Sequence, residues 1–523
     1  MTHANGSALL EWREYRYFPY EKEFAEAEVR SVLGTEPIEA DGGLLVPAGR
    51  AVPDRVRRLT YFGRVLLPDG STSVPDQAVL ETGVLNGRRQ ATRYSAHGIH
   101  EYKGKFNPQV VRAIGNILGL ETGSRILDPF CGSGTTLLES AHAGWHSLGI
   151  DRNPMAVRIA KAKLRAFKIA TGPLPNYVEK LTRSLGGFVE ELSHDQAVPK
   201  RALDLLLGSG WTDQIPSFDY LSRWFPLPVL GQAWLVLRTV RELELSTDDS
   251  NIFEVILSDL LREASLQEPA DLRIRRRRDP QANYPLLGPF LEMLEQRVDT
   301  IIRAREGVPH TDTTHHAFVG DNRTREAYAC SDESFDALIT SPPYATALPY
   351  IDTQRLSLVL LGDVGSKEIS GLERSLTGAR EISAGNRREL EARIRARDSR
   401  MPDSVNALCT TLLEAASGPE NGFRRKNKPA LVYRYFDDMR RFFEAVRPVL
   451  KSASTAALVV GHNRTTLGGT EFLIDTPALL GDVASSVGFE LVNSRTMDTY
   501  PRYDLHQDNS IDSETLIEVR AEP

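Results

Sequence analysis

Two short segments of this chain carry the residue types that could perform chemistry. The first, Asp128–Thr136, reads DPFCGSGTT and follows the apolar residues Ile126 and Leu127. The second, Thr340–Tyr344, reads TSPPY and follows the apolar run Phe335–Ile339. Each pattern predicts a short buried strand that ends in a polar turn, and the first turn leads into a helix. Glycines let a ligand approach such a turn closely, and the start of the helix adds a partial positive charge.

The alternation of strand-like and helix-like segments predicts a doubly wound α/β sheet. Residues 169–312 interrupt this alternation, because their apolar residues follow helical spacing. We expect the last two strands of the sheet to form an antiparallel edge. The predicted strands are Arg125–Asp128, Ser147–Asp151, Ala317–Asp321, Phe335–Thr340, Ala456–Gly461, Phe489–Arg495 and Leu516–Arg520.

The two polar segments resemble motifs I and IV of the amino-methyltransferases, which use S-adenosylmethionine to modify exocyclic NH2 groups of nucleic-acid bases. Upstream, Lys105–Pro108 (KFNP) is similar to motif X of the same family. The order X, I, long insert, IV resembles the alpha arrangement of the DNA members. This resemblance implies a Rossmann-like S-adenosylmethionine-dependent methyltransferase fold, with a mostly parallel sheet of seven strands and a helical inserted target-recognition lobe.

The resemblance also divides the chain into regions. Residues 1–90 form an N-terminal accessory region, and residues 91–168 hold the first half of the methyltransferase domain, with motifs X, I and II. Residues 169–312 are too long for a connecting loop and are predicted to be the target-recognition domain. Residues 313–523 hold the second half, with motifs III–VIII. A polar insert at 363–429 interrupts this half, and we expect it to close over the DNA.

A cofactor with an adenosine and an amino-acid tail needs a glycine-lined turn for the tail, a carboxylate for the ribose and a polar group for the adenine. We place Asp128 near the ammonium group, Asp151 at the ribose, and Asp321 with Asn322 at the adenine. The cofactor would leave as S-adenosylhomocysteine. The predicted cofactor residues are Phe106, Asp128, Pro129, Phe130, Gly132, Gly134, Thr135, Asp151, Asp321 and Asn322.

The second segment suits an attack by an exocyclic amine, which is a poor nucleophile because its lone pair is delocalised into the ring. The Ser341 hydroxyl and the Pro342 carbonyl can accept the two amine hydrogens. The adjacent prolines fix these acceptors before the substrate arrives. Tyr344 can stack on a base that is flipped out of the duplex. We therefore predict direct methyl transfer, with Ser341, Pro342, Pro343 and Tyr344 as the catalytic residues.

The leading serine bears on the substrate. Within the family a serine at this position is typical of cytosine-N4 enzymes, so the resemblance implies methylation of cytosine N4 in a short duplex recognition sequence. Adenine-N6 methylation of DNA is the nearer alternative, and guanine-N2 methylation of transfer RNA is another. A non-catalytic binding subunit with the same fold is a further class. Cytosine-C5 chemistry needs a cysteine after a proline, and none of the three cysteines follows one.

The composition, 41% hydrophobic and 25% charged, is typical of a soluble globular protein. No segment reaches the ~20 apolar residues of a membrane span, and no secretory signal is recognisable at the N-terminus. The dispersed cysteines exclude a disulfide scaffold, and we expect no metal site. A prokaryotic cytoplasm, with association to the nucleoid, is the expected location.

Double-stranded DNA is the expected partner, although a net charge of −7 does not by itself favour nucleic-acid binding. Phosphate contacts need only a local basic surface, and two basic segments supply one. A cognate restriction endonuclease stays open as a second partner, as does the choice between a monomer and a homodimer. The residues predicted to contact nucleic acid are Arg273, Arg275, Arg276, Arg277, Arg278, Arg424, Arg425 and Lys426.

Overall fold

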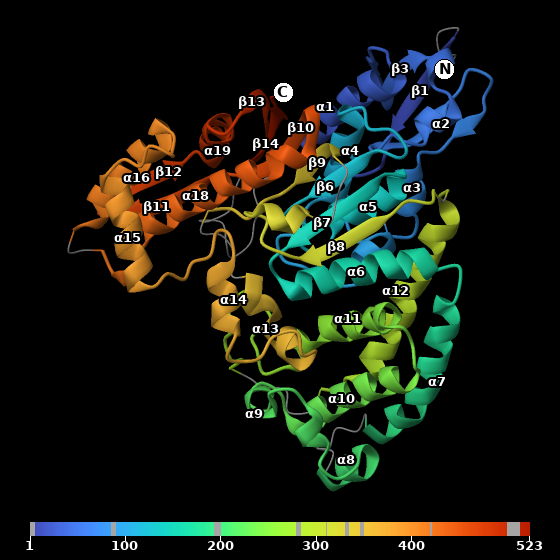
Figure 1. Cartoon of the computed structure of the whole chain (residues 1–523). Helices are drawn as coiled ribbons and strands as arrows, with labels where there is room; N and C mark the ends of the chain where they lie inside the picture. The colour runs from blue at the N-terminus through green and yellow to red at the C-terminus, as the bar shows by residue number, and fades with distance from the viewer. Residues whose placement is uncertain are drawn as a thin grey trace.

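The computed structural model of the chain describes residues 6–84, 90–192, 200–278, 284–309, 311–329, 334–345, 350–418, 421–498 and 513–522. Its centre is a sheet of seven strands in the order β13-β14-β10-β9-β6-β7-β8. Figure 1 shows an N-terminal domain in blue beside this sheet, a helical lobe in green below it, and an arm in orange that projects to one side.

The central sheet has the topology that the sequence predicts. β10, β9, β6, β7 and β8 are parallel to one another in this order, and β14 runs antiparallel between β10 and β13. Each predicted strand is present, and the last two form the predicted antiparallel edge. The fold is therefore the Rossmann-like fold of S-adenosylmethionine-dependent methyltransferases. The strands are β6 (Arg125–Asp128), β7 (His146–Asp151), β8 (His315–Val319), β9 (Phe335–Thr340), β10 (Leu450–Gly461), β13 (Phe489–Asp498) and β14 (Ser513–Ala521).

Successive residues of the strands pack into opposite helical layers, as the period of a strand requires. Ile126 on β6 joins the core formed with α4 (Pro108–Ile117), whereas its neighbour Leu127 joins the core formed with α18 and α19 (Thr476–Ser485). α18 (Lys428–Val446) leads into β10. Pro429 suits its first turn, and Pro448 cannot continue it, so β10 starts at Leu450.

The N-terminal domain is a second sheet, with the order β2-β3-β1-β4-β5. Buried hydrogen bonds attach it to α4: Glu28 Oε1 accepts from Asn116 Nδ2 at 2.8 Å, and Glu81 Oε1 accepts from Gln109 Nε2 at 2.9 Å. Its elements are β1 (Ser7–Trp12), α1 (Pro19–Glu28) continued by a π-helical turn (Val29–Leu33), β2 (Ile38–Ala40), β3 (Gly43–Pro47), α2 (Pro53–Val56), β4 (Phe62–Leu66), β5 (Thr72–Ser73) and α3 (Asp76–Leu80).

The helical lobe lies between α6 and β8 in the chain and shares a core with α6. Asp259 anchors the lobe to the segment before α4, because its Oδ1 accepts from the Glu101 backbone N at 2.7 Å. Its Oδ2 pairs with Arg297 on α12 of the lobe at 2.6 Å. No helix in the described part of the chain is long and apolar enough to cross a membrane. The helices are α5 (Thr135–Ala143), α6 (Pro154–Ile169), α7 (Leu174–Leu192), α8 (Lys200–Leu207), α9 (Phe218–Leu221), α10 (Leu227–Glu242), α11 (Thr247–Ala264) and α12 (Leu287–Gly307).

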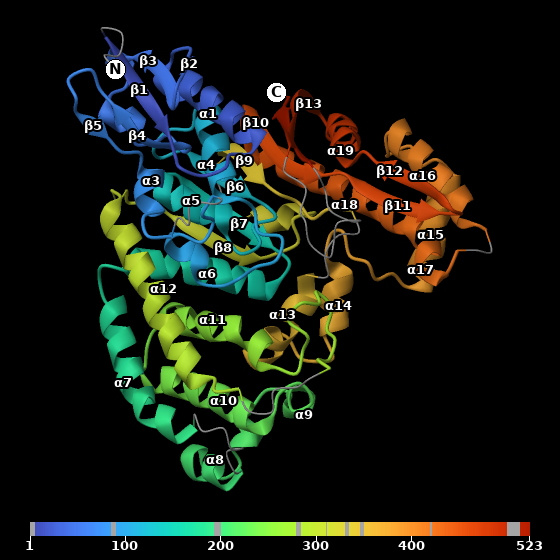
Figure 2. The same cartoon turned by 180° about the vertical axis from the view of Figure 1, so that it is seen from behind.

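The polar insert after β9 forms more core than its composition suggests. Leu390, Val405 and Cys409 are buried in the core around α18. With the hairpin of β11 (Asn463–Leu467) and β12 (Thr470–Ile474), the later helices of the insert form the projecting arm, which Figure 2 shows from behind. The helices are α13 (Tyr350–Leu360), α14 (Ile369–Ser375), α15 (Ala384–Arg395), α16 (Asp403–Ala416) and α17 (Phe423–Lys426).

The attachment of α4 to the sheet can be tested at Gly115. A Cβ atom there would lie 2.1 Å from Cη2 of the buried Trp145, so Gly115→Ala should lower the free energy of unfolding by about 1–3 kcal/mol. Gly186→Ala on α7 meets open space and should instead raise it by up to about 1 kcal/mol. Urea denaturation of both variants measures the difference, and equal stabilities would contradict the packing of α4.

Candidate cofactor pocket and active site

A pocket opens where the parallel strands of the sheet end. Because these strands run in the same direction, the turns that follow them meet at one edge. The pocket brings together ten of the predicted residues. These are Phe106, Asp128, Phe130, Gly132, Thr135, Asp151, Asp321, Asn322, Ser341 and Pro343. Pro129, Gly134, Pro342 and Tyr344 are adjacent in sequence to these residues and are not part of the lining.

The two glycines of the first motif serve different purposes. Gly132 has a φ of +48° and faces the pocket, where a Cβ atom would contact the Tyr102 ring at 3.5 Å. Gly134 has a φ of +76°, and a Cβ atom would lie 2.6 Å from the Cβ of Ala160 on α6. Gly134 therefore allows α5 to start close against α6, while Gly132 keeps the backbone open toward a ligand.

Two carboxylates line the pocket: Asp128 is buried and Asp151 is half-buried. Asp128 Oδ1 accepts hydrogen bonds from Thr340 Oγ1 at 2.6 Å and from the Phe130 backbone N at 3.2 Å. Burial raises the pKa of Asp128 to about 6. Asp151 accepts from the backbone N of Gly132 at 2.9 Å and of Asn153 at 2.8 Å, and burial raises its pKa as well. Acceptors at these positions suit an ammonium group and sugar hydroxyls.

The third strand end contains an ion pair that the sequence analysis missed. Both Asp321 oxygens accept from Arg323, at 2.7 and 2.8 Å. Burial of Asp321 opposes its ionisation, but the pairing with Arg323 outweighs this effect and lowers the pKa of Asp321. Asn322 donates from Nδ2 to the Pro129 carbonyl at 2.6 Å, so its amide holds the first motif in place. Asp321 still lines the pocket, together with Arg323.

The second motif connects to strands on its other side. Ser341 Oγ donates to the Val459 carbonyl on β10 at 3.1 Å. A hydroxyl that donates its hydrogen to a carbonyl retains its lone pairs, which can accept hydrogen bonds from an amine. Tyr344 donates from its hydroxyl to Glu514 Oε1 on β14 at 2.5 Å. The geometry thus sets an acceptor at the pocket and fixes the Tyr344 hydroxyl to β14.

Several pocket residues are not among the predicted cofactor residues. Lys105 belongs to the predicted motif X but was given no role, whereas Tyr102 and Arg152 lie outside the predicted motifs. Lys105 donates to the Thr92 carbonyl at 2.5 Å, and burial lowers the pKa of its ammonium group. Ser375, Leu376 and Thr377 come from the polar insert, far from either motif in sequence.

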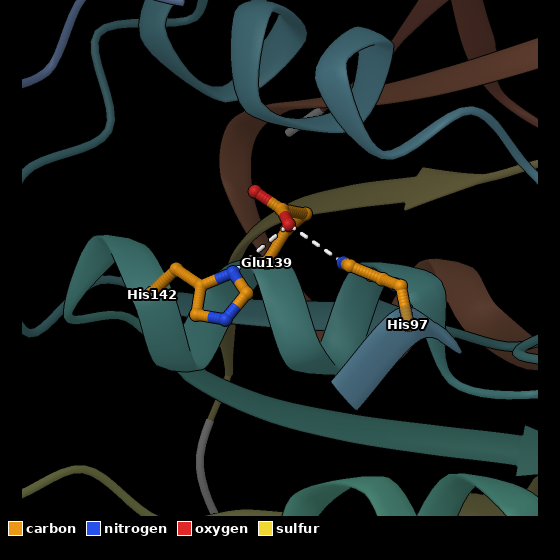
Figure 3. Close-up of side chains that lie close together, drawn as sticks. All are labelled: His97, Glu139 and His142. Atoms are coloured by element: carbon orange, nitrogen blue, oxygen red, sulfur yellow. Dashed lines mark hydrogen bonds and ion pairs between the residues drawn. The ribbon is translucent and has the colours of Figure 1, made fainter. Parts of the chain in front are cut away.

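A buried hydrogen-bonded cluster forms around the Glu139 carboxylate of α5 (Figure 3). Glu139 Oε1 accepts from His97 Nε2 at 2.7 Å, from His142 Nδ1 at 2.9 Å and from the Tyr94 hydroxyl at 2.8 Å. Among the described residues, His97, Glu139 and His142 are the group whose types and spacing could hold a metal ion. The distances, however, are those of hydrogen bonds to one carboxylate oxygen.

The charges around this cluster also oppose a metal ion. Arg112 Nη1 lies 3.9 Å from Glu139 Oε2 and already balances the carboxylate. Burial, followed by the charge of Lys105, lowers the pKa of His97. A divalent cation would add charge next to these groups without a second carboxylate to neutralise it. The cluster therefore fits a hydrogen-bonded anchor, which joins α5 to the segment before α4.

Residues 99–174 match the family of RMKL-like methyltransferase domains. This stretch contains Phe106, the first motif and the first two strands of the central sheet. The chain is 26% identical over 302 residues to the type II methyltransferase M.BsoBI of Geobacillus stearothermophilus, over 54% of this chain and 55% of the relative. It is 25% identical over 283 residues to the type II methyltransferase M.MvaI of Kocuria varians, over 51% of this chain and 57% of the relative.

A shorter match, 35% identical over 68 residues, links the chain to a tRNA (guanine(10)-N2)-dimethyltransferase of Methanothermobacter thermautotrophicus (strain Delta H), over 13% of this chain and 20% of that relative. The chain spans somewhat over half the length of the two type II methyltransferases. These matches agree with the sheet order and with the residues gathered at its edge. Together they identify a methyltransferase domain in this chain that is similar to those of the type II DNA methyltransferases.

Proposed function

We propose that this chain transfers a methyl group from S-adenosylmethionine to the exocyclic N4 amine of cytosine in a short duplex DNA sequence. One observation carries the proposal: Ser341 and Pro343 line the same pocket as Asp128 and Asp151. The acceptor for the amine therefore lies beside the groups that suit the cofactor. The two type II methyltransferases to which the chain is similar support DNA as the substrate.

The cofactor, when bound, supplies an electrophilic methyl group on its sulfonium. In the proposed site the Asp128 carboxylate attracts the ammonium of the amino-acid tail, and Asp151 accepts from the ribose hydroxyls. Phe106 and Phe130 add apolar surface to the lining. Asn322 acts indirectly, since its bond to the Pro129 carbonyl holds the turn that admits the tail.

The residues of the second motif orient the amine. Ser341 Oγ and the Pro342 carbonyl accept the two amine hydrogens, which directs the nitrogen lone pair toward the methyl group. Tyr344 stacks on the flipped base, and its bond to Glu514 holds the ring in place. The amine proton can leave after methyl transfer, so the proposed mechanism requires no general base of shifted pKa.

The basic segment of the helical lobe supports contacts with phosphates. Arg273, Arg275, Arg276 and Arg278 are exposed. Arg277 is half-buried and donates to the carbonyls of Gln267 and Glu263 at 3.0 and 2.9 Å, so it stabilises its own loop. Arg276, although exposed, also donates to the Arg223 carbonyl. On the arm, Arg424 and Arg425 are exposed on α17 and Lys426 is half-buried. We propose the helical lobe as the target-recognition element, with the exposed arginines as its phosphate contacts.

The product of the reaction tests the proposed substrate. The purified chain is incubated with genomic DNA, bulk tRNA and labelled S-adenosylmethionine, and the methylated nucleosides are identified by mass. We expect N4-methylcytosine in DNA. N6-methyladenine in DNA would show that the serine does not select cytosine, and label only in tRNA would move the function to the RNA enzymes.

Substitutions in the second motif test the mechanism. Ser341→Ala should lower kcat by about 10²–10³-fold, because one pre-positioned acceptor is lost. Tyr344→Ala removes the stacking surface, worth about 1–3 kcal/mol, whereas Tyr344→Phe keeps the ring and should retain most of the activity. Ser452→Ala, on an exposed position of β10, is the matched control. Full activity of Ser341→Ala would refute the assigned role.

The raised pKa of Asp128 predicts a pH dependence of cofactor binding. Below a pH of about 6 the carboxyl group becomes neutral and no longer attracts the ammonium group. Affinity for S-adenosylhomocysteine should therefore rise about tenfold between pH 5 and pH 7, as expected for one titrating charge. Calorimetry on Asp128→Asn should show weaker and pH-independent binding, and Asp336→Asn on β9, outside the pocket lining, serves as the control.

Stability gives an independent check on the same variant. A carboxyl group whose pKa is raised by burial stabilises the fold below its unfolded pKa, and this contribution is lost as the pH rises through about 6. Asp128→Asn should therefore be no less stable than the natural chain at pH 8. An unchanged pH slope of S-adenosylhomocysteine binding in this variant would contradict the role of Asp128.

Salt dependence tests the basic segment. Replacing Arg275 and Arg278 with alanine should weaken binding to duplexes of any sequence and lower the slope of log affinity against log salt by about 0.9 for each lost contact. Arg183→Ala, at an exposed position of α7, should leave the slope unchanged. Fluorescence anisotropy over a salt series measures both. An unchanged slope in the Arg275 and Arg278 variants would remove this segment from the DNA interface.

A further inference from the structure

The polar insert contributes one wall of the pocket. Ser375, the last residue of α14, lines the pocket together with Leu376 and Thr377, and Gly378 follows them. We call these four residues the strap. All four are half-buried. The sequence analysis expected the whole insert to close over the DNA, yet this part of it lies at the edge of the sheet where the predicted cofactor residues gather.

Two arginines at strand ends fasten the strap to the pocket. Arg152, which follows Asp151 at the end of β7, donates from Nε to Ser375 Oγ at 3.2 Å. Arg323, which follows β8, donates from Nη2 to the Ser375 carbonyl at 2.9 Å. These are the strand ends assigned to the ribose and the adenine of the cofactor. The strap therefore lies on the nucleoside side of the pocket.

Arg323 is itself held firmly. Its guanidinium donates to both oxygens of Asp321 and, from Nη1, to Asp438 Oδ1 on α18 at 2.8 Å. Its side chain is only 13% exposed, and these carboxylates raise its pKa against the effect of burial. A planar group fixed by charge-assisted bonds on several sides has little freedom to move. The Ser375 carbonyl is thus bound to a rigid anchor.

The other end of the strap packs on the catalytic motif. Gly378 has a φ of +75°, and a Cβ atom there would lie 3.0 Å from the Tyr344 carbonyl oxygen and 3.6 Å from the Pro343 Cβ. Beyond the strap, Arg434 on α18 donates to the carbonyls of Ala379 and Glu381. The strap therefore spans from the nucleoside side of the pocket to the turn that presents Ser341.

We propose that the strap covers the adenosyl half of the cofactor and positions the Ser341–Tyr344 turn, so that one segment serves both halves of the active site. Leu376 and Thr377 would contact the nucleoside, and Arg323 acts as a positioning residue through Ser375. The proposal rests on the proposed cofactor site and is independent of which base is methylated. It assigns to the polar insert a part in catalysis besides any contact with DNA.

Two ligands distinguish the part of the cofactor that the strap covers. Leu376→Ala should weaken S-adenosylhomocysteine and methylthioadenosine equally, by about tenfold, because both contain the adenosyl half. Leu372→Ala, one helical turn earlier on α14, packs on the same core without lining the pocket and should bind both as the natural chain does. Weakening of S-adenosylhomocysteine alone, or no change in either ligand, would overturn the proposed coverage.

A pair of glycines tests the contact with the catalytic turn. Gly378→Ala forces a strained backbone and a tight contact with the Tyr344 carbonyl oxygen, so kcat at saturating cofactor should fall about tenfold or more. Gly371→Ala on α14 meets open space and should keep full activity. An unchanged kcat in Gly378→Ala would overturn the coupling. Binding of the two ligands to Leu376→Ala is measured by calorimetry without nucleic acid. The test of cofactor coverage by the strap is therefore independent of which substrate is methylated.

Discussion

A buried hydrogen bond, 2.6 Å from Thr340 Oγ1 to Asp128 Oδ1, joins residues that lie 212 positions apart. It exists because β6 and β9 are parallel neighbours, with Leu127 opposite Leu338. This register brings the first residues of the two motifs together. The helical lobe occupies the chain between these strands, yet it leaves their pairing intact. The proposed cofactor site and catalytic turn therefore depend on one strand register, and a shift of one residue would separate them.

Two other regions hold the segment before α4, and a third holds α4 itself. These contacts explain how the segment can form a pocket wall without long helices or strands. The helical lobe binds it through Asp259, which accepts from the Glu101 backbone N. α5 binds it through Glu139, which accepts from His97. The N-terminal domain binds α4 itself through Glu28, which accepts from Asn116. In each case a largely buried carboxylate is satisfied by donors from another region, so loss of a donor would leave a costly buried charge.

Local pattern determines how much of this site the sequence could predict. Asp128 and Asp151 end strands whose apolar residues are contiguous in sequence. The same local pattern therefore predicts both the strand and the carboxylate at its end. Arg323 and the residues 375–377 could not, because their roles arise from contacts between distant segments. Asn322 shows the same limit: its position was predicted, but its bond to the Pro129 carbonyl depends on how two strand ends meet.

The arginines of this chain explain why its net charge of −7 says little about a nucleic-acid partner. Many of them neutralise carboxylates within the fold, as Arg158 does for Asp363 and Glu254, and Arg393 for Asp437. Even in the basic segment of the helical lobe, Arg277 is used internally. Under the proposed function, a small exposed subset makes the phosphate contacts, so non-specific attraction is modest. Selectivity must then come mainly from direct contacts to bases and from the flipped base at Tyr344.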